Sequence, residues 1–156
     1  MHILAIDPGP KQSAYIIWNT SDEKPVAFNI LDNEQILILV KTNISDAFVI
    51  EMMQGFGMPV GQEVFNTCVW IGRFLESHMI KKLGPGTCAF IYRKDIKLYF
   101  CGSVRAKDAN IRQALIDRFG RQGTKKNPGT LYGIKRDVWS ALALAVYYQD
   151  MQKRKI

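Results

Sequence analysis

"MHILAIDPGP", residues 1–10, joins a buried strand to a charge. The apolar run Ile3–Ile6 leads directly into Asp7, and a Pro-Gly turn follows. A similar arrangement recurs in "AFVIEMMQGFG", residues 47–57, where the apolar run ends at Glu51 before a glycine-rich loop. Charged side chains are rarely buried without a partner. The two segments therefore predict strands that each place a carboxylate at the C-terminal end.

Apolar periodicity divides the rest of the chain into strands and helices. We expect an antiparallel meander at the N-terminus, and after it strands that alternate with helices. Residues 34–40 fit a short helix as well as a strand. The expected strands cover residues 2–7, 14–19, 25–31, 47–51 and 87–92, and the expected helices cover residues 61–83, 107–120 and 135–151, with Gly84-Pro85-Gly86 ending the first helix. This order indicates an α/β fold in one domain, residues 1–156.

The composition is that of a folded protein without a membrane span or a secretion signal. Hydrophobic residues make up 47% of the 156 residues, and no apolar run approaches the roughly 18 residues that a membrane helix needs. Asp7 and Pro8 interrupt the first apolar run too early for a signal peptide. We therefore expect a soluble, cytoplasmic protein. The cysteines and histidines show neither a disulfide framework nor a zinc spacing.

Positive charge is concentrated in one part of the chain. The net charge is +7, and residues 91–136 alone hold 12 basic and 3 acidic residues, whereas residues 1–90 hold 6 basic and 9 acidic ones. Such a segment suits a polyanion, because contacts to phosphates dominate non-specific nucleic-acid binding. The alternative is a basic surface that only aids solubility.

A third carboxylate, Asp137, lies at the start of the C-terminal helix. That helix is apolar around most of its circumference, so we expect Asp137 to be partly buried; the alternative is a charge that merely favours the helix N-terminus. For Asp7, the alternative interpretation is an ordinary turn residue before Pro-Gly. If these two and Glu51 converge, their mutual repulsion requires a cation. Oxygen ligands select Mg²⁺ or Mn²⁺, and a two-metal site beside a basic surface suits phosphodiester hydrolysis.

Five segments together resemble the RuvC family of Holliday junction resolvases, and most closely its compact phage and prophage members. They are "ILAIDPGP", "FVIEMMQGFG", "GSVRAKDANIRQALIDRFG", "GTKKNPGTLYG" and "DVWSALALAVYY". The resemblance implies a ribonuclease H-like fold, with a five-stranded mixed sheet of three antiparallel N-terminal strands and then parallel ones, flanked by helices. It also implies a homodimer in a bacterial host that nicks four-way DNA junctions with metal ions during recombination and repair.

The resemblance assigns roles to the residues of the site. It implies that Asp7, Glu51 and Asp137 bind two Mg²⁺ or Mn²⁺ ions, and that Lys107 contacts the scissile phosphate. The family usually has an aspartate where this chain has Ser140, which puts the second ion in question. Either Asp137 then serves with less help, or Ser140 acts through water. For Lys107, the alternative is a solvated residue in the first turn of a helix.

Further residues are expected to contact DNA or a second protomer. Phe56 corresponds to an aromatic residue that stacks into an opened junction; the alternative is a hydrophobic lid over the core. The expected DNA contacts are Arg105, Arg121, Lys125, Lys126 and Arg136, three of them in a loop at 121–133 that could otherwise be plainly disordered. The helix at 61–83 is expected to dimerise, and its apolar stripe is Val64, Cys68, Ile71, Leu75 and Met79.

Two other functions fit the same residues. One is a different ribonuclease H-like nuclease that acts on RNA–DNA hybrids or flaps. The other is a junction-binding protein with weak catalysis, which Ser140 makes plausible. Two symmetric active sites in a dimer would favour the resolvase over the first, and cleavage in Mg²⁺ or Mn²⁺ would separate it from the second.

Overall fold

The computed structural model describes residues 1–81 and 87–154. The elements are β1 (His2–Asp7), β2 (Gln12–Asn19), β3 (Lys24–Asp32), α1 (Asn33–Thr42), β4 (Ala47–Met52), α2 (Gln62–Lys81), β5 (Thr87–Tyr92), α3 (Arg93–Cys101), α4 (Asp108–Phe119) and α5 (Val138–Lys153). All five predicted strands are present, and the ambiguous segment at 34–40 is helical. The predicted helix stop at Gly84-Pro85-Gly86 lies outside the described residues.

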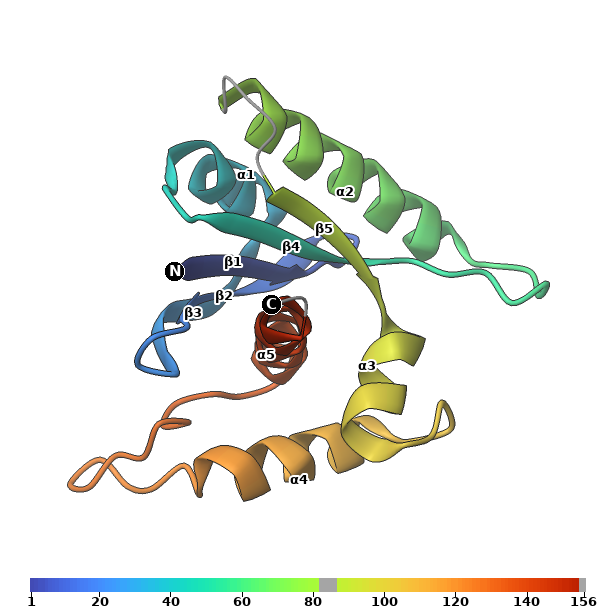
Figure 1. The fold of residues 1–156 in the computed structure, drawn as a ribbon. Helices are drawn as coiled ribbons and strands as arrows, with labels where there is room; N and C mark the ends of the chain where they lie inside the picture. The colour runs from blue at the N-terminus through green and yellow to red at the C-terminus, as the bar shows by residue number, and fades with distance from the viewer. Residues whose placement is uncertain (82–86, 155–156) are drawn as a thin grey trace.

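The five strands form one mixed sheet in the order β3-β2-β1-β4-β5 (Figure 1). β1, β2 and β3 pair antiparallel, and β4 and β5 run parallel to β1. The predicted arrangement of three antiparallel strands followed by parallel ones is therefore confirmed. β4 is an inner strand between β1 and β5, which explains why it is apolar on both faces.

Alternate residues of the strands pack on opposite faces of the sheet. In β1, Ile3 and Ala5 belong to the core against α5, whereas Leu4 and Ile6 belong to the core against α1 and α2. Figure 1 shows α1 and α2 on one side of the sheet and α5, seen end-on, on the other, with α3 beside α5 and α4 beyond it. The sheet thus separates two hydrophobic cores.

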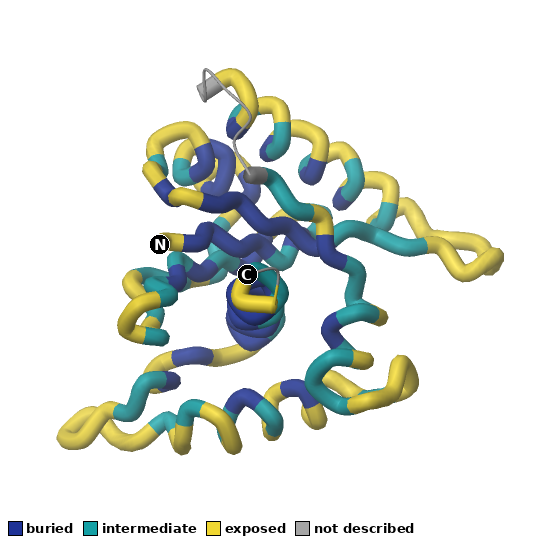
Figure 2. Tube along the Cα trace, in the orientation of Figure 1, coloured by how far each residue is buried: buried dark blue, intermediate teal, exposed yellow. Residues whose placement is uncertain are grey.

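The last helix lies between the sheet and α4, which explains its almost uniform apolar composition. Its residues are buried along nearly the whole length (Figure 2). Within the described part of the chain, neither this helix nor any other is long and apolar enough to cross a membrane. α5 begins at Val138, three residues later than predicted, because residues 135–137 still belong to the preceding turns.

The buried side of α2 differs from the predicted stripe. Its buried residues are Thr67, Ile71, Phe74 and His78, whereas Met79 is 68% exposed. The apolar pattern misplaced this face by about one residue, because a polar threonine and a histidine occupy core positions. His78 stacks on the ring of Phe48, with 4.7 Å between ring centroids, so an aromatic contact keeps it in the core.

Candidate active site at the carboxyl edge of the sheet

Asp7 and Glu51 lie side by side at the carboxyl ends of two neighbouring strands. β1 and β4 are parallel and pair Ile6 with Ile50, so the next residue of each strand is the carboxylate. Because side chains alternate between faces, both acidic residues point to the α5 side of the sheet. The register of β1 and β4 therefore brings the two strand-end carboxylates together.

A tightly bonded turn fixes the position of Asp7. Asn33 donates from its side-chain amide to the carbonyl of Gly9 at 2.8 Å, and the Ser13 hydroxyl donates to the Asn33 side-chain oxygen at 2.5 Å. The backbone N–H of Gly9 in turn donates to Ser13 at 3.2 Å. Ser13 and Asn33 are both buried. The chain after β1 is therefore held to the start of α1, and Asp7 has little freedom to move.

We expect Gly9→Ala to destabilise the protein by about 1–2 kcal/mol. A Cβ atom at Gly9 would lie 2.3 Å from the carbonyl oxygen of Gln12, and backbone must shift to relieve that clash. Thermal denaturation measures the change. Gly55→Ala is the matched control, because a Cβ atom there meets nothing within 4 Å. Equal melting temperatures for the two variants would contradict the tight turn.

Asp137 and Ser140 approach the strand carboxylates from the start of α5. Asp137 is the N-cap residue of α5 and is exposed, so the expectation that it is partly buried was wrong. The apolar surface of α5 begins only with Val138, and the charge stays in solvent at the helix end. Ser140 lies one turn inside, where it forms a hydrogen bond that favours the ionised form of Asp7.

The carboxyl group of Asp7 is held in an unfavourable environment for a charge. Burial, and then the neighbouring charge of Glu51, raise its pKa to about 8, with a further contribution from Asp137. Burial also raises the pKa of Glu51, although the Arg93 guanidinium opposes the shift. A carboxyl group whose pKa is raised this far by burial and a neighbouring carboxylate is typical of a functional site.

Arg93, which the sequence reasoning did not single out, lies among these groups. It is the first residue of α3 and directly follows β5, so it reaches the same edge of the sheet. Its guanidinium lies 3.3 Å from Glu51, 3.0 Å from the Ser140 hydroxyl and 2.8 Å from Asp108. The charges of Glu51, Asp108 and Asp7 raise the pKa of Arg93 in spite of its burial.

The donor chemistry of this site suits a hard divalent cation, but its acidic groups are not packed as a ready cluster. Among the described residues, no group of three or more His, Cys, Asp or Glu side chains is arranged to hold a metal ion. Asp7, Glu51, Asp137 and Ser140 nevertheless offer only oxygen atoms, which Mg²⁺ and Mn²⁺ prefer. Asp7, with its raised pKa, is the group that a cation would stabilise most.

The other predicted site residues lie on exposed loops and turns around this edge. Lys107 caps α4, next to the Asp108 that pairs with Arg93, and is exposed. Arg105 is exposed in the α3–α4 connection. Phe56 is 74% exposed in the loop that follows β4, so it does not cover the core as a lid. Its free ring and the position after Glu51 fit the predicted stacking role, which stays a prediction.

Two lysines form the tip of a short hairpin rather than a structureless loop. Gly123 pairs with Pro128, and Thr124 and Asn127 exchange backbone hydrogen bonds of 3.0 and 3.1 Å. Lys125 and Lys126 lie between them and are exposed, as is Arg121 at the base. The Gln122 side chain anchors the hairpin by donating to the carbonyls of Leu131 and Ile134. The lysines are therefore presented on an ordered projection.

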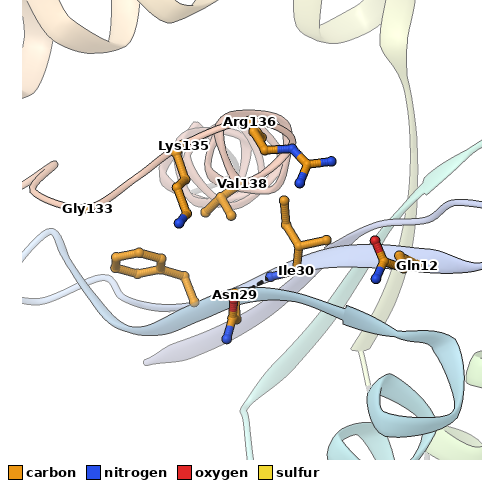
Figure 3. Close-up of a pocket in the computed structure, with 8 residues that line it drawn as sticks. Gln12, Asn29, Ile30, Gly133, Lys135, Arg136 and Val138 are labelled. Carbon is orange, nitrogen blue, oxygen red and sulfur yellow. Dashed lines mark hydrogen bonds between the residues drawn. The ribbon is translucent and has the colours of Figure 1, made fainter.

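A basic cavity of about 420 Å³ lies beside the start of α5. Lys135 and Arg136 project from the α5 side into the space above β3, where Asn29 and Ile30 lie (Figure 3). Between described residues, neither cation forms an ion pair. Arg136 adopts a left-handed backbone conformation with φ of 48°, which is costly for a residue with a side chain. The cavity suits an anionic group that is attached to a partly apolar one, because cations and apolar side chains both line it.

Solved structures share this architecture at low sequence identity. RuvC from Thermus thermophilus matches with a TM-score of 0.68 and 12% identity over 97% of both chains. T. thermophilus RuvC in complex with a Holliday junction substrate gives 0.70 and 12%, covering 97% of this chain and 96% of that one. The yeast mitochondrial Holliday junction resolvase Ydc2 gives 0.64 and 12%, covering 99% of this chain and 84% of Ydc2.

The comparisons establish the fold. No family model matches the chain, and the search of curated proteins gives no significant match. TM-scores of 0.68 and 0.70 over 97% of this chain show a shared architecture, and at 12% identity the likeness extends to the fold alone. The strand order and the helices around the sheet are those of the ribonuclease H-like fold found in RuvC, as the sequence predicted.

Proposed function

We propose that this protein is a structure-specific endonuclease that hydrolyses phosphodiester bonds at four-way or branched DNA junctions. The observation that carries the proposal is the meeting of Asp7 and Glu51 at one sheet edge, opposite Asp137. Its fold is that of proteins described as Holliday junction resolvases. We further propose a phage or prophage origin and action in the bacterial cytoplasm, on recombination intermediates or branched phage DNA.

In this proposal, Asp7 and Glu51, with Asp137 and Ser140, hold Mg²⁺ or Mn²⁺. The bound metal supplies an activated water molecule and stabilises charge on the leaving 3′ oxygen. Water adds to phosphorus, the bond to the 3′ oxygen breaks, and that oxygen takes up a proton. The strand register brings Asp7 and Glu51 together. We propose that Lys107, the N-cap residue of α4, contacts the scissile phosphate.

The basic groups around the site support a nucleic-acid substrate. The hairpin at 123–128 presents Lys125 and Lys126, and the cavity beside α5 presents Lys135 and Arg136. Arg105 and Arg121, which precede the hairpin in the sequence, add exposed charge. We propose that these residues contact DNA phosphates, and that Phe56 stacks on an exposed base of the junction.

We expect the double substitution Lys125→Ala and Lys126→Ala to weaken junction binding about tenfold near physiological salt, because two phosphate contacts are lost. The slope of log affinity against log salt should fall by roughly two. Fluorescence anisotropy with a labelled junction at several salt concentrations measures both quantities. Lys41→Ala with Arg73→Ala removes the same charge from α1 and α2, on the other side of the sheet, and an equal loss there would contradict a specific contact.

A second protomer is proposed to dock on the outer face of α2. Phe65, Val69 and Ile80 are 56%, 63% and 75% exposed, which is unusual for large apolar residues spaced along one helix. We expect Phe65→Glu with Val69→Glu to convert a dimer to a monomer while the fold remains intact. Sedimentation velocity and circular dichroism test this. A wild-type monomer at micromolar concentration would refute the dimer.

The proposed activity is tested with a labelled synthetic four-way junction in Mg²⁺ and in Mn²⁺. Symmetric nicks on the junction, absent from linear duplex and from flap or RNA–DNA substrates, are the expected result. Cleavage of flaps or hybrids instead would identify another nuclease of the same fold.

Binding without cleavage would identify a junction-binding protein. The residues around Ser140 favour this second function. Ser140 offers a hydroxyl in the position where the resemblance expects an acid, and Arg93 already pairs with Glu51. Ser140→Asp is then the informative variant. Gain of cleavage in that variant would show that the site lacks only one carboxylate.

A further inference from the structure

The guanidinium of Arg93 occupies the centre of the acidic site. Its side chain is only 26% exposed, and one nitrogen faces Glu51 while the other faces both Ser140 and Asp108. The Ser140 hydroxyl, on its other side, bonds to Asp7. Hydrogen bonds and charge therefore connect Asp7, Ser140, Arg93 and Glu51 in one continuous network.

The net charge of this network is more positive than that of the acidic ligand set expected from the resemblance. A serine at this position removes one negative charge from the expected ligand set, and Arg93 adds one positive charge beside it. Both differences reduce the need for a second metal ion. One divalent ion and one guanidinium together more than balance the two buried carboxylates Asp7 and Glu51, while Asp137 and Asp108 are exposed and screened by solvent.

The space around Arg93 leads to the same conclusion. The cavity bounded by Arg93, Asp108, Trp139 and Ser140 measures about 20 Å³. A volume of that size holds about one water molecule. Mg²⁺ gives up its water ligands reluctantly and keeps several of them in most protein sites. A second hydrated ion therefore has no room in this cavity, between Ser140 and Asp108, while the Arg93 side chain is in place.

We propose that Arg93 is a further catalytic residue that takes the place of a second metal ion. The site then binds one divalent ion per protomer, and the Arg93 guanidinium binds the non-bridging oxygens of the scissile phosphate. A planar guanidinium suits this contact because it can donate two parallel hydrogen bonds to a phosphate. Asp108 orients Arg93 from the solvent side. This inference rests on the proposed nuclease function.

Counting bound Mn²⁺ ions tests the proposal independently of activity. Metal-free protein is titrated with Mn²⁺, and electron paramagnetic resonance measures the free ion. We expect one ion per protomer in the wild type and two in the double variant Arg93→Met with Ser140→Asp. Arg112→Met with Ser140→Asp is the matched control. Arg112 lines the same cavity and stacks on Trp139 at 4.8 Å without an ion pair to Glu51, so this control should stay at one ion.

Single-turnover cleavage then distinguishes a role of Arg93 in the chemical step from a role in binding the junction. We expect Arg93→Met to slow cleavage by about 10²–10³-fold while affinity for the junction changes less than threefold. Two ions in the wild type, or one in the double variant, would overturn the substitution of metal by Arg93 and leave the nuclease proposal intact. Absence of bound Mn²⁺ overturns both. If the wild type binds one Mn²⁺ ion per protomer but cleaves no DNA, the expected metal count is supported. The nuclease function, and with it a catalytic role of Arg93, is then overturned.

Discussion

Asp7→Asn is expected to lower junction cleavage by roughly 10³-fold or more and, in the same molecule, to stabilise the metal-free protein. Asparagine keeps the size of the side chain and loses the charge that a metal ion requires. It also removes a carboxylate that burial and Glu51 make unfavourable, with a pKa of about 8. The gain should be on the order of 2 kcal/mol, or about 4–8 °C in melting temperature.

The stabilisation by Asp7→Asn depends on pH in a defined direction. The folded protein holds a proton on Asp7 up to about pH 8, whereas the unfolded chain releases it near pH 4. Stability of the metal-free wild type is therefore lost as the pH rises through this interval. Thermal denaturation in chelator should show a large difference between variant and wild type at pH 8.5 and almost none at pH 4.

Asp117→Asn is the matched control for that experiment, because Asp117 lies on α4 and bonds only to Gln113 on its own helix among the hydrogen bonds described. It should change neither cleavage nor the pH profile. A stabilisation by Asp7→Asn that is equal at both pH values would show that the Asp7 charge is not the cause. Retention of cleavage would remove Asp7 from the site.

Asp150→Ala is expected to destabilise the fold by about 3 kcal/mol, or roughly 6–12 °C in melting temperature. Asp150 is buried near the end of α5 and accepts two hydrogen bonds from Arg118 of α4 and one of 2.7 Å from Tyr99 of α3. These bonds lower the pKa of Asp150 although burial opposes them. Its contribution is therefore present above about pH 4 and lost as the pH falls below.

The substitution should also disturb the candidate active site, because Asp150 bonds to both α3, which carries Arg93, and α4, which follows Lys107. We expect faster hydrogen exchange in α3 and α4, and slower cleavage at temperatures where the variant is still folded. Asp117→Ala, on the exposed side of α4, serves as the control for removal of a carboxylate. Unchanged stability of Asp150→Ala would show that solvent replaces the lost contacts.

The strands and their carboxylates were predictable because the apolar runs end abruptly on a charge. Asp7 and Glu51 follow continuous hydrophobic segments, and the parallel pairing of those segments brings them together. Asp137 was harder to place. The apolar surface of α5 suggested burial, but a side chain one residue before the helix turns outward and stays in solvent.

Arg93 was missed although it obeys the same rule as the carboxylates. It follows the strand "TCAFIY" directly, as Asp7 and Glu51 complete theirs. A pattern of acidic strand ends does not by itself predict a cation at the end of a third strand, which is where Arg93 lies. The face of α2 was misjudged for a different reason, since Thr67 and His78 are polar by type and lie in the core because of their contacts.

The alternation of side chains in β1 and β4 has a consequence for protein engineering. The groups proposed to be catalytic lie on the α5 side of the sheet, and the surface proposed for self-association lies on α2, on the other side. Each surface can therefore be redesigned without disturbing the other. Opposite charges introduced at Phe65 and Val69 in two versions of the chain would favour a mixed pair. With Asp7→Asn in one version only, such a pair would reveal whether the two strands of a junction are cut independently or in concert.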